Sequence, residues 1–470
     1  MNRLAADFAI TACGLVGSAG LSLLVTVITA RAVGVEEFGL YSFAFAYVCL
    51  WAPLMDGGAS LLAAREVARG RGREVLAGLL VIKPVQLAVS LVLLTGVATL
   101  AGLEARLLWL IALLAVGSAV DTCFGLASAA FRGQGRFGRD TLHQLGQRSL
   151  FAVLAAAFLA TGNGVIGVAA ARAASVTVAT TAAFRLLHRE GSIAWGAARR
   201  WFHHKDPAWH SPLRSMLIVD LMGQLLTRTG PLVLRATRGL AEVGLYAAAG
   251  RLVEGLSLLP TAFGMALLFR LTGPERPSPD AMVARMRAAL RQIATLGVIV
   301  VGPGLLWADE IMVFLYGPSY AASAEPFRLL MGVLLLAMVN GVLRVGLIAA
   351  DAERVYAAGM VLAALSAIGL NVVLTPRWGA SGSAVASLCA ETLLCAVGLA
   401  ALRRRHPAVS PWLDWGRLAL GSLTCVAAIW AVKLLSPLMA AILTIIAVGA
   451  GVATMSPLSL WTSVGSRRER

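Results

Sequence analysis

Long apolar runs alternate with short polar segments along the whole chain. Each run is about twenty residues long, the length of helix that crosses the hydrocarbon core of a bilayer. In hydrocarbon every backbone donor and acceptor must be satisfied within the segment, so runs of this length are expected to be helices. The pattern predicts an all-α integral membrane protein with about 14 transmembrane helices. The expected spans are 8–30, 40–63, 76–100, 107–129, 141–160, 164–187, 213–234, 243–268, 288–306, 326–349, 355–375, 380–401, 416–434 and 437–458.

The composition supports a membrane location. Hydrophobic residues make up 59% of the 470 residues and charged residues 14%, whereas a soluble domain is about half apolar and a quarter charged. The apolar runs leave no stretch long enough for a globular domain. Only two gaps, 188–212 and 307–325, exceed a short turn by much.

The positive charges gather in alternate connections. Because Lys and Arg are retained on the cytoplasmic side of a membrane, these connections and both termini are expected to be cytoplasmic. The net charge of +16 is dispersed over loops that the topology already requires to be basic, which argues against nucleic-acid binding. The basic connections carry Arg65, Arg69, Arg71 and Arg73; Arg132, Arg136 and Arg139; the 188–212 segment; Arg270, Arg276, Arg285 and Arg287; Arg403, Arg404 and Arg405; and the tail 467–470.

Two short motifs occur twice. The segment 31–47, RAVGVEEFGLYSFAFAY, aligns with 235–251, RATRGLAEVGLYAAAGR, and the second copy has one extra residue in its loop. Gly164-Val-Ile-Gly167 likewise resembles Gly379-Ala-Ser-Gly382. The offsets of 205 and 215 residues are similar, so we infer a duplication of six spans with a parallel orientation. Transporters built from such repeats place the substrate site between the halves, near the midplane.

The repeat predicts the division of the chain. We expect an N-terminal six-helix lobe over 1–187, a cytoplasmic interlobe linker over 188–212 and a C-terminal six-helix lobe over 213–402. Two additional helices and a basic cytoplasmic tail are expected over 403–470. The two lobes should surround a central cavity.

The chain resembles the polysaccharide or oligosaccharide flippases of the multidrug, oligosaccharidyl-lipid and polysaccharide exporter superfamily. The resemblance covers essentially the whole chain and depends on loose patterns: the turn 30–41, Asp56-Gly57-Gly58 with Arg65-Glu66-Val67-Ala68, the segment 314–320, and Gly379-Ala-Ser-Gly382. It implies a flippase, not an enzyme, that moves an isoprenoid-pyrophosphate-linked oligosaccharide to the outer leaflet of the bacterial cytoplasmic (inner) membrane by alternating access. Membrane lipids and other polysaccharide-assembly proteins are the implied partners, and no cofactor or metal is expected.

Three other functions share parts of this pattern. A peptidoglycan-precursor flippase would bind a similar lipid-linked substrate, and a drug or cation antiporter of the same superfamily would share the architecture but favour acidic cavity residues. A membrane polymerase or ligase of polysaccharide assembly would be expected to carry a large outward loop with acidic or His residues. No outward loop expected in this chain is longer than about twenty residues.

Charged residues inside the spans are the candidate functional residues. A charge in a span costs about 2.5–3.5 kcal/mol on insertion scales, so it is expected to face a cavity or a partner. Arginine forms a planar fork that matches phosphate oxygens. We therefore expect a cationic substrate site and a smaller set of acidic coupling or gating residues. The substrate-binding candidates are Arg228, Arg344, Arg251, Arg148 and Arg172, and the coupling candidates are Asp220, Glu254 and Glu391.

Overall fold

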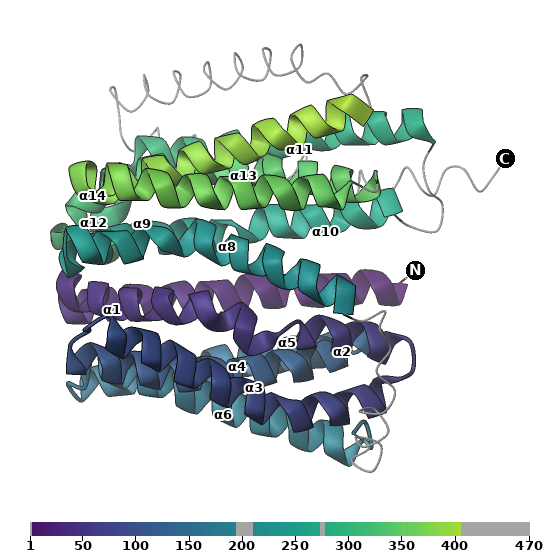
Figure 1. The fold of residues 1–470 in the computed structure, drawn as a ribbon, viewed down its shortest axis with the longest axis horizontal. Coiled ribbons are helices and arrows are strands. Elements are labelled where there is room, and N and C mark those ends of the chain that lie inside the picture. The colour runs from purple at the N-terminus through teal and green to yellow at the C-terminus, as the bar shows by residue number, and fades with distance from the viewer. Residues whose placement is uncertain (1, 194–209, 273–277, 351, 406–470) are drawn as a thin grey trace.

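The computed structural model describes residues 2–193, 210–272, 278–350 and 352–405, and the regular elements in these ranges are helices (Figure 1). They are α1 (Asn2–Asp56), α2 (Ala59–Ala68), α3 (Gly72–Leu100), α4 (Ala105–Gly133), α5 (Phe137–Ala160), α6 (Gly164–Arg189), α8 (His210–Thr237), α9 (Leu240–Leu256), α10 (Leu258–Thr272), α11 (Pro279–Leu306), α12 (Ala308–Tyr316), the 3-10 helix η3 (Pro318–Ser323), α13 (Ala324–Ala349) and α14 (Glu353–Arg405). The prediction of an all-α fold is confirmed. Helices cover the first twelve expected spans, while 416–434 and 437–458 lie outside the described residues.

Seven helices in the described part of the chain are long and apolar enough to cross a membrane. Two of them, Val16–Asp56 and Arg354–Arg404, have 41 and 51 residues. At 1.5 Å per residue each is about 60 Å or more in length, roughly twice the thickness of a hydrocarbon core. Each contains one non-helical residue, Gly34 or Gly379, where two expected spans meet.

The helices form two groups that lie side by side (Figure 1). In the first group α1 packs on α5 and α4, and α6 packs on α4 and α5. In the second group α14 packs on α13 and α8, and α13 packs on α11. The groups meet where α1 lies against α8 and α9. The first group corresponds to the expected N-terminal lobe and the second to the expected C-terminal lobe, although the exact domain boundaries remain predictions.

The backbone reproduces the internal repeat. Gly34 and Gly239 both have positive φ, 79° and 92°, with ψ of 175° and −177°. Gly164 and Gly379 also have similar positive φ values, 53° and 56°. These conformations are open mainly to glycine. The agreement at both pairs supports the inferred duplication.

Hydrogen bonds and an ion pair join the two groups at one end of the helices, which we call the Gly34 end. Arg31 of α1 donates from Nε to the carbonyl of Leu315 at 2.6 Å and from Nη2 to that of Phe314. The Tyr320 hydroxyl donates to the carbonyl of Ala30 at 3.1 Å. The Arg235 guanidinium lies 3.8 Å from Glu104. The Gly34 end is therefore closed in this conformation.

The closest approach of the groups at this end is between two glycines. A Cβ atom added to Gly39 of α1 would overlap the carbonyl oxygen of Leu240, and one added to Gly244 of α9 would overlap that of Val35. Gly39 and Gly244 are equivalent in the repeat, and so are Val35 and Leu240. The two backbones thus cross around the local pseudo-twofold axis, and neither glycine position has room for a side chain.

The second expected span, 40–63, is broken. α1 ends at Asp56 and α2 begins at Ala59, because Gly57 and Gly58 have left-handed φ values of 61° and 76°. The carbonyls released at the end of α1 are satisfied from α3. Lys83, which is 2% exposed, donates from Nζ to the carbonyls of Met55 at 2.8 Å and Asp56 at 3.1 Å. The eighth expected span, 243–268, is also broken, at Ser257 between α9 and α10, where Pro260 has no N–H to donate to the preceding turn.

Replacing Lys83 by methionine is expected to lower the thermal stability. The variant keeps the volume but loses two hydrogen bonds from a charged group, each worth about 1.5–3 kcal/mol, and leaves two buried carbonyls without a partner. Unfolding in detergent, followed by circular dichroism, measures the effect. The matched control is Gln86→Leu, which removes one neutral hydrogen bond to the carbonyl of Leu54. If both variants melted at the wild-type temperature, Lys83 would not hold the broken helix.

Candidate functional site

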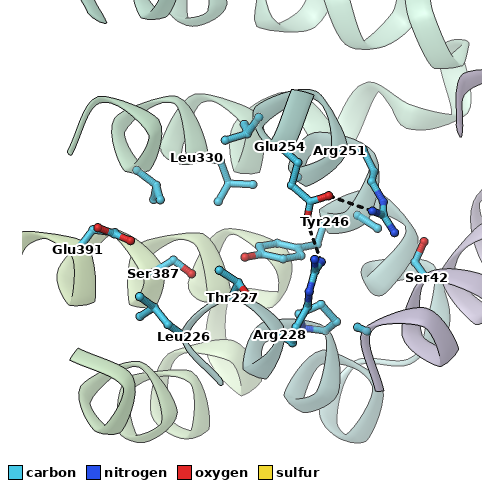
Figure 2. A pocket seen from close by; sticks show the side chains of 16 residues that line it. Ser42, Leu226, Thr227, Arg228, Tyr246, Arg251, Glu254, Leu330, Ser387 and Glu391 are labelled. Carbon is cyan, nitrogen blue, oxygen red and sulfur yellow. Dashed lines mark hydrogen bonds and ion pairs between the residues drawn. The ribbon is translucent and has the colours of Figure 1, made fainter. Parts of the chain in front are cut away.

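Arg228, Arg251 and Glu254 form a bridged triplet in the second group. Arg228 lies on α8, and Arg251 and Glu254 lie one turn apart on α9. The Nη1 atom of Arg228 donates to Oε1 of Glu254 at 2.7 Å, and the Nη1 atom of Arg251 donates to Oε2 at 2.9 Å (Figure 2). One carboxylate thus holds two guanidinium groups.

The first group contributes an aromatic ring to the same place. The guanidinium carbons of Arg251, Arg172 and Arg228 lie 4.5, 5.0 and 6.0 Å from the centroid of Phe45 on α1. Arg172 on α6 also donates to Oδ2 of Asp121 at 3.0 Å. Three of the five predicted arginines therefore gather around one phenylalanine, where the two helix groups meet. We call Phe45 with these three arginines the Phe45 cluster.

A pocket opens beside the Phe45 cluster (Figure 2). Its walls come from both groups: Ser42 and Ala46 of α1 lie across from residues of α8, α9, α13 and α14. The lining residues are Ser42, Ala46, Leu226, Thr227, Arg228, Pro231, Tyr246, Ala247, Gly250, Arg251, Val253, Glu254, Leu330, Val333, Ser387 and Glu391. The first half thus contributes the hydroxyl of Ser42, and the charged and other polar lining residues come from the second half.

The cluster has more cations than anions. Arg148 of α5 lies within electrostatic range of Arg172, Arg251 and Asp121, so four arginines share two carboxylates, those of Asp121 and Glu254. Moreover, the Nε atoms of Arg172 and Arg228 are buried without a hydrogen-bond partner. A buried donor without a partner is costly. Arg228 and Arg251 line the pocket, so an oxyanion that enters it would supply the missing negative charge next to them.

The remaining candidates lie apart from this cluster. Glu391 lines the far side of the pocket (Figure 2). The amide of Asn340 donates to its Oε2 atom at 2.6 Å. Arg344 is not among the lining residues and lies near Tyr356. Asp220 lies away from the pocket and within electrostatic range of Asp56, a residue of the first group. The structure thus brings Arg228, Arg251, Arg172, Arg148 and Glu254 together, and separates Arg344 and Asp220 from them.

Sequence reasoning missed Phe45 and Tyr246. An aromatic residue inside an apolar span gives no sign of its own that it faces a cavity. The repeat did contain a signal, because Tyr246 is equivalent to Tyr41, and Arg251 is equivalent to the pocket-lining Ala46. If the equivalent helices of the two repeats had been assumed to pack against each other, these equivalent positions would have indicated the residues of the pocket walls.

The chain has recognisable relatives. The family model described as "Polysaccharide biosynthesis protein" matches residues 4–269, more than half of the chain. The curated proteins give no match.

Several solved structures are similar in fold at low sequence identity. A structure of the lipid II flippase MurJ in an inward closed conformation has a TM-score of 0.73 at 14% identity, and the alignment covers 96% of this chain and 99% of that one. A MOP superfamily transporter from Pyrococcus furiosus has a TM-score of 0.63 at 17% identity over 86% of this chain and 96% of its own. An inward-facing multidrug resistance MATE family transporter has a TM-score of 0.62 at 16% identity over 84% and 95%. The protein is a multi-pass membrane protein with the fold of these transporters, and the match over 4–269 shows that it belongs to the polysaccharide biosynthesis protein family.

Proposed function

We propose that the protein is a flippase that moves an isoprenoid-pyrophosphate-linked oligosaccharide from the cytoplasmic to the outer leaflet, for assembly of a cell-surface polysaccharide. The observation that carries the proposal is the Phe45 cluster, in which arginines from both helix groups meet beside a pocket. Membership of the polysaccharide biosynthesis family favours an oligosaccharide as the cargo. The transporter fold favours movement of the substrate over its chemical conversion.

The charge of the site fits a pyrophosphate. Around the Phe45 cluster, four arginines and the carboxylates of Asp121 and Glu254 leave a net charge of about two positive, and Glu391 on the far side of the pocket lowers the total to about one. A pyrophosphate that links a lipid to a sugar carries about two negative charges, which would pair with this positive excess. Guanidinium groups bind phosphate oxygens through pairs of parallel N–H donors. The apolar walls of the pocket strengthen these interactions because they lower the local dielectric constant.

The arrangement of the groups supports alternating access. The Gly34 end carries the turns that the charge pattern predicts to face outward, and it is closed by contacts between the groups. The pocket would then load from the cytoplasmic side in this conformation. Rocking of one group against the other would open the Gly34 end and release the headgroup outward.

Coupling to an ion or to the membrane potential would act through the acidic candidates. Glu254 is held by two arginines, so it is suited to tuning the charge of the substrate site. Glu391 lines the same pocket with an amide as its hydrogen-bond partner. Asp220 lies within electrostatic range of Asp56 of the first group, so its ionisation would act between the two groups.

Arg228→Ala is expected to reduce transport at least tenfold, because it removes a guanidinium that faces the pocket and leaves Glu254 with one partner. The measurement is flipping of a fluorescent isoprenoid-pyrophosphate-linked oligosaccharide in proteoliposomes, with insertion verified by the amount of folded protein. Arg228→Lys keeps the charge but loses the planar fork, so an intermediate rate is expected. Arg189→Ala, at the exposed end of α6, is the matched control.

Three results would count against the proposal. Full transport by Arg228→Ala would show that the Phe45 cluster is not the substrate site. Transport of a lipid-linked peptidoglycan precursor in preference to the oligosaccharide would favour the precursor flippase, and transport of an organic cation would favour the antiporter.

The proposed location is the bacterial cytoplasmic (inner) membrane with both termini in the cytoplasm, and the proposed partners are membrane lipids and other proteins of polysaccharide assembly.

A further inference from the structure

We infer that Phe45 is the positioning residue of the substrate site: its ring gathers the three guanidinium groups and keeps the phosphate-binding edges of Arg228 and Arg251 directed to the pocket, which these two residues line. The inference rests on the proposed function, since it concerns the same pyrophosphate site. It adds a residue without any charge or polar atom to the machinery of that site.

The three arginines need such a residue. Like charges in a low-dielectric region repel one another strongly, and long arginine side chains can turn toward water at either membrane face. Glu254 neutralises only part of the charge of Arg228 and Arg251, and Asp121 forms its ion pair with Arg172. The electron-rich faces of an aromatic ring attract cations within about 6 Å. Phe45 meets this condition for all three side chains, with Arg251 and Arg172 at 4.5 and 5.0 Å.

Stacking on a ring leaves a guanidinium free to bind phosphate. The N–H donors of arginine lie in the plane of the group and point away from its edges, so a stacked arginine still presents its fork. In Arg228 and Arg251 the Nη1 atoms donate to Glu254, which leaves the other nitrogens for a ligand. A carboxylate would orient the guanidinium groups but would also occupy these N–H donors. A phenylalanine ring orients them and leaves the donors free for a ligand.

The orientation of the ring is itself fixed by packing. Phe45 stacks on Tyr41, one helical turn earlier on α1, with ring centroids 6.4 Å apart and an interplanar angle of 13°. Tyr41 is buried and lies within electrostatic range of Arg172, Arg251 and Arg148. The ring therefore has a defined direction before any substrate enters.

The aromatic ring is present in only one of the two repeats. By the offset of 205 residues the equivalent of Phe45 is Gly250 on α9, where a Cβ atom would meet nothing within 4 Å. Gly250 lines the pocket. The first group thus supplies the ring, and the second group supplies open space and two of the arginines. Since the ring and Arg172 belong to one group and Arg228 and Arg251 to the other, the cluster forms only when the groups are in this relative position.

The test varies the electrostatic character of the ring at constant shape. Phenylalanines with one, two or three fluorine atoms are placed at position 45 by nonsense suppression, and binding of farnesyl pyrophosphate to the purified protein in lipid nanodiscs is measured by calorimetry. Fluorine withdraws electron density from the ring face, so the affinity is expected to fall stepwise, to roughly one tenth of the wild-type value with three fluorine atoms. Phe45→Leu is expected to lose at least as much, and Phe45→Trp to retain the wild-type affinity.

The matched control is the same fluorine series at Phe43. That residue is buried two positions earlier on α1 and stacks on Tyr47, away from the arginines, so its series should leave the affinity unchanged. An unchanged affinity across the Phe45 series, with binding still weakened by Arg228→Ala, overturns the role of Phe45 and leaves the proposed function standing. Failure of the wild type to bind farnesyl pyrophosphate overturns the pyrophosphate site and the inference together.

Discussion

Replacing Gly39 by alanine is expected to open the Gly34 end of the protein. The added methyl group would overlap the carbonyl oxygen of Leu240, and a backbone atom within a helix cannot move aside as a side chain can. Overpacking of this kind costs about 1–3 kcal/mol, which changes an equilibrium between two conformations about 5- to 150-fold. Because each helix group is packed internally, separation of α1 from α9 relieves the overlap at the lowest cost.

The separation can be measured as a distance between spin labels on the two groups. Labels at Glu36 and Arg377, both exposed, are expected to lie several ångström farther apart in Gly39→Ala than in the otherwise identical parent without native cysteines. Gly244→Ala should act in the same direction, because Gly244 is the repeat equivalent and faces the carbonyl of Val35. Gly20→Ala on the same helix α1 is the control, since a Cβ atom at Gly20 would meet nothing within 4 Å. Parental distances in both glycine variants would mean that this crossing does not set the conformation.

The duplicated motif is the part of the sequence that predicted most about this crossing. It related Gly39 to Gly244 before the structure placed them together, because both repeats must use the same turn to pass from one span to the next. The motif could not indicate that the two copies touch. That contact depends on how two whole helix groups pack, and each group is held by side chains far from the motif.

The breaks in the second and eighth spans show a similar limit. An apolar run predicts a helix because hydrocarbon forces the backbone to satisfy itself. The helix over 40–63 is interrupted at Gly57 and Gly58, and Lys83 from another helix supplies the donors that the interrupted backbone lacks. Lys83 was recognisable as a charge inside the third span, but its partner lies 27 or 28 residues earlier in the chain. Periodicity along one helix does not identify the neighbouring helix.

The same limit explains the candidate site. Arg228 and Arg251 were candidates because each is a charge inside a span, and the structure brings both to the pocket. Arg344 was a candidate on the same ground, but it lies outside the lining of the pocket. A charge in a span indicates that a partner or cavity exists. Which of the two it is depends on the helix that packs against it.

The pocket itself is best tested at Gly250, where a larger side chain is expected to abolish transport without harming the fold. Gly250 lines the pocket beside Arg251, and a Cβ atom there would meet nothing within 4 Å. A phenylalanine at this position would project into the space that the substrate headgroup needs. Replacing glycine within a helix also removes a cost of about 0.5–1 kcal/mol, so the variant should be at least as stable as the wild type.

The series Gly250→Ala, Gly250→Leu and Gly250→Phe is expected to lower the rate of flipping progressively, with at least a tenfold loss for phenylalanine. Transport is measured in proteoliposomes, and the melting temperature in detergent is measured on the same preparations. Gly255→Phe is the matched control: Gly255 lies on the same helix α9 with equally open space around its Cβ position, but it does not line the pocket. Wild-type transport by Gly250→Phe would place the substrate path elsewhere. A loss of transport in both Gly250→Phe and Gly255→Phe would assign the effect to α9 as a whole. Occlusion of the pocket predicts a loss that grows with side-chain size and occurs only at position 250.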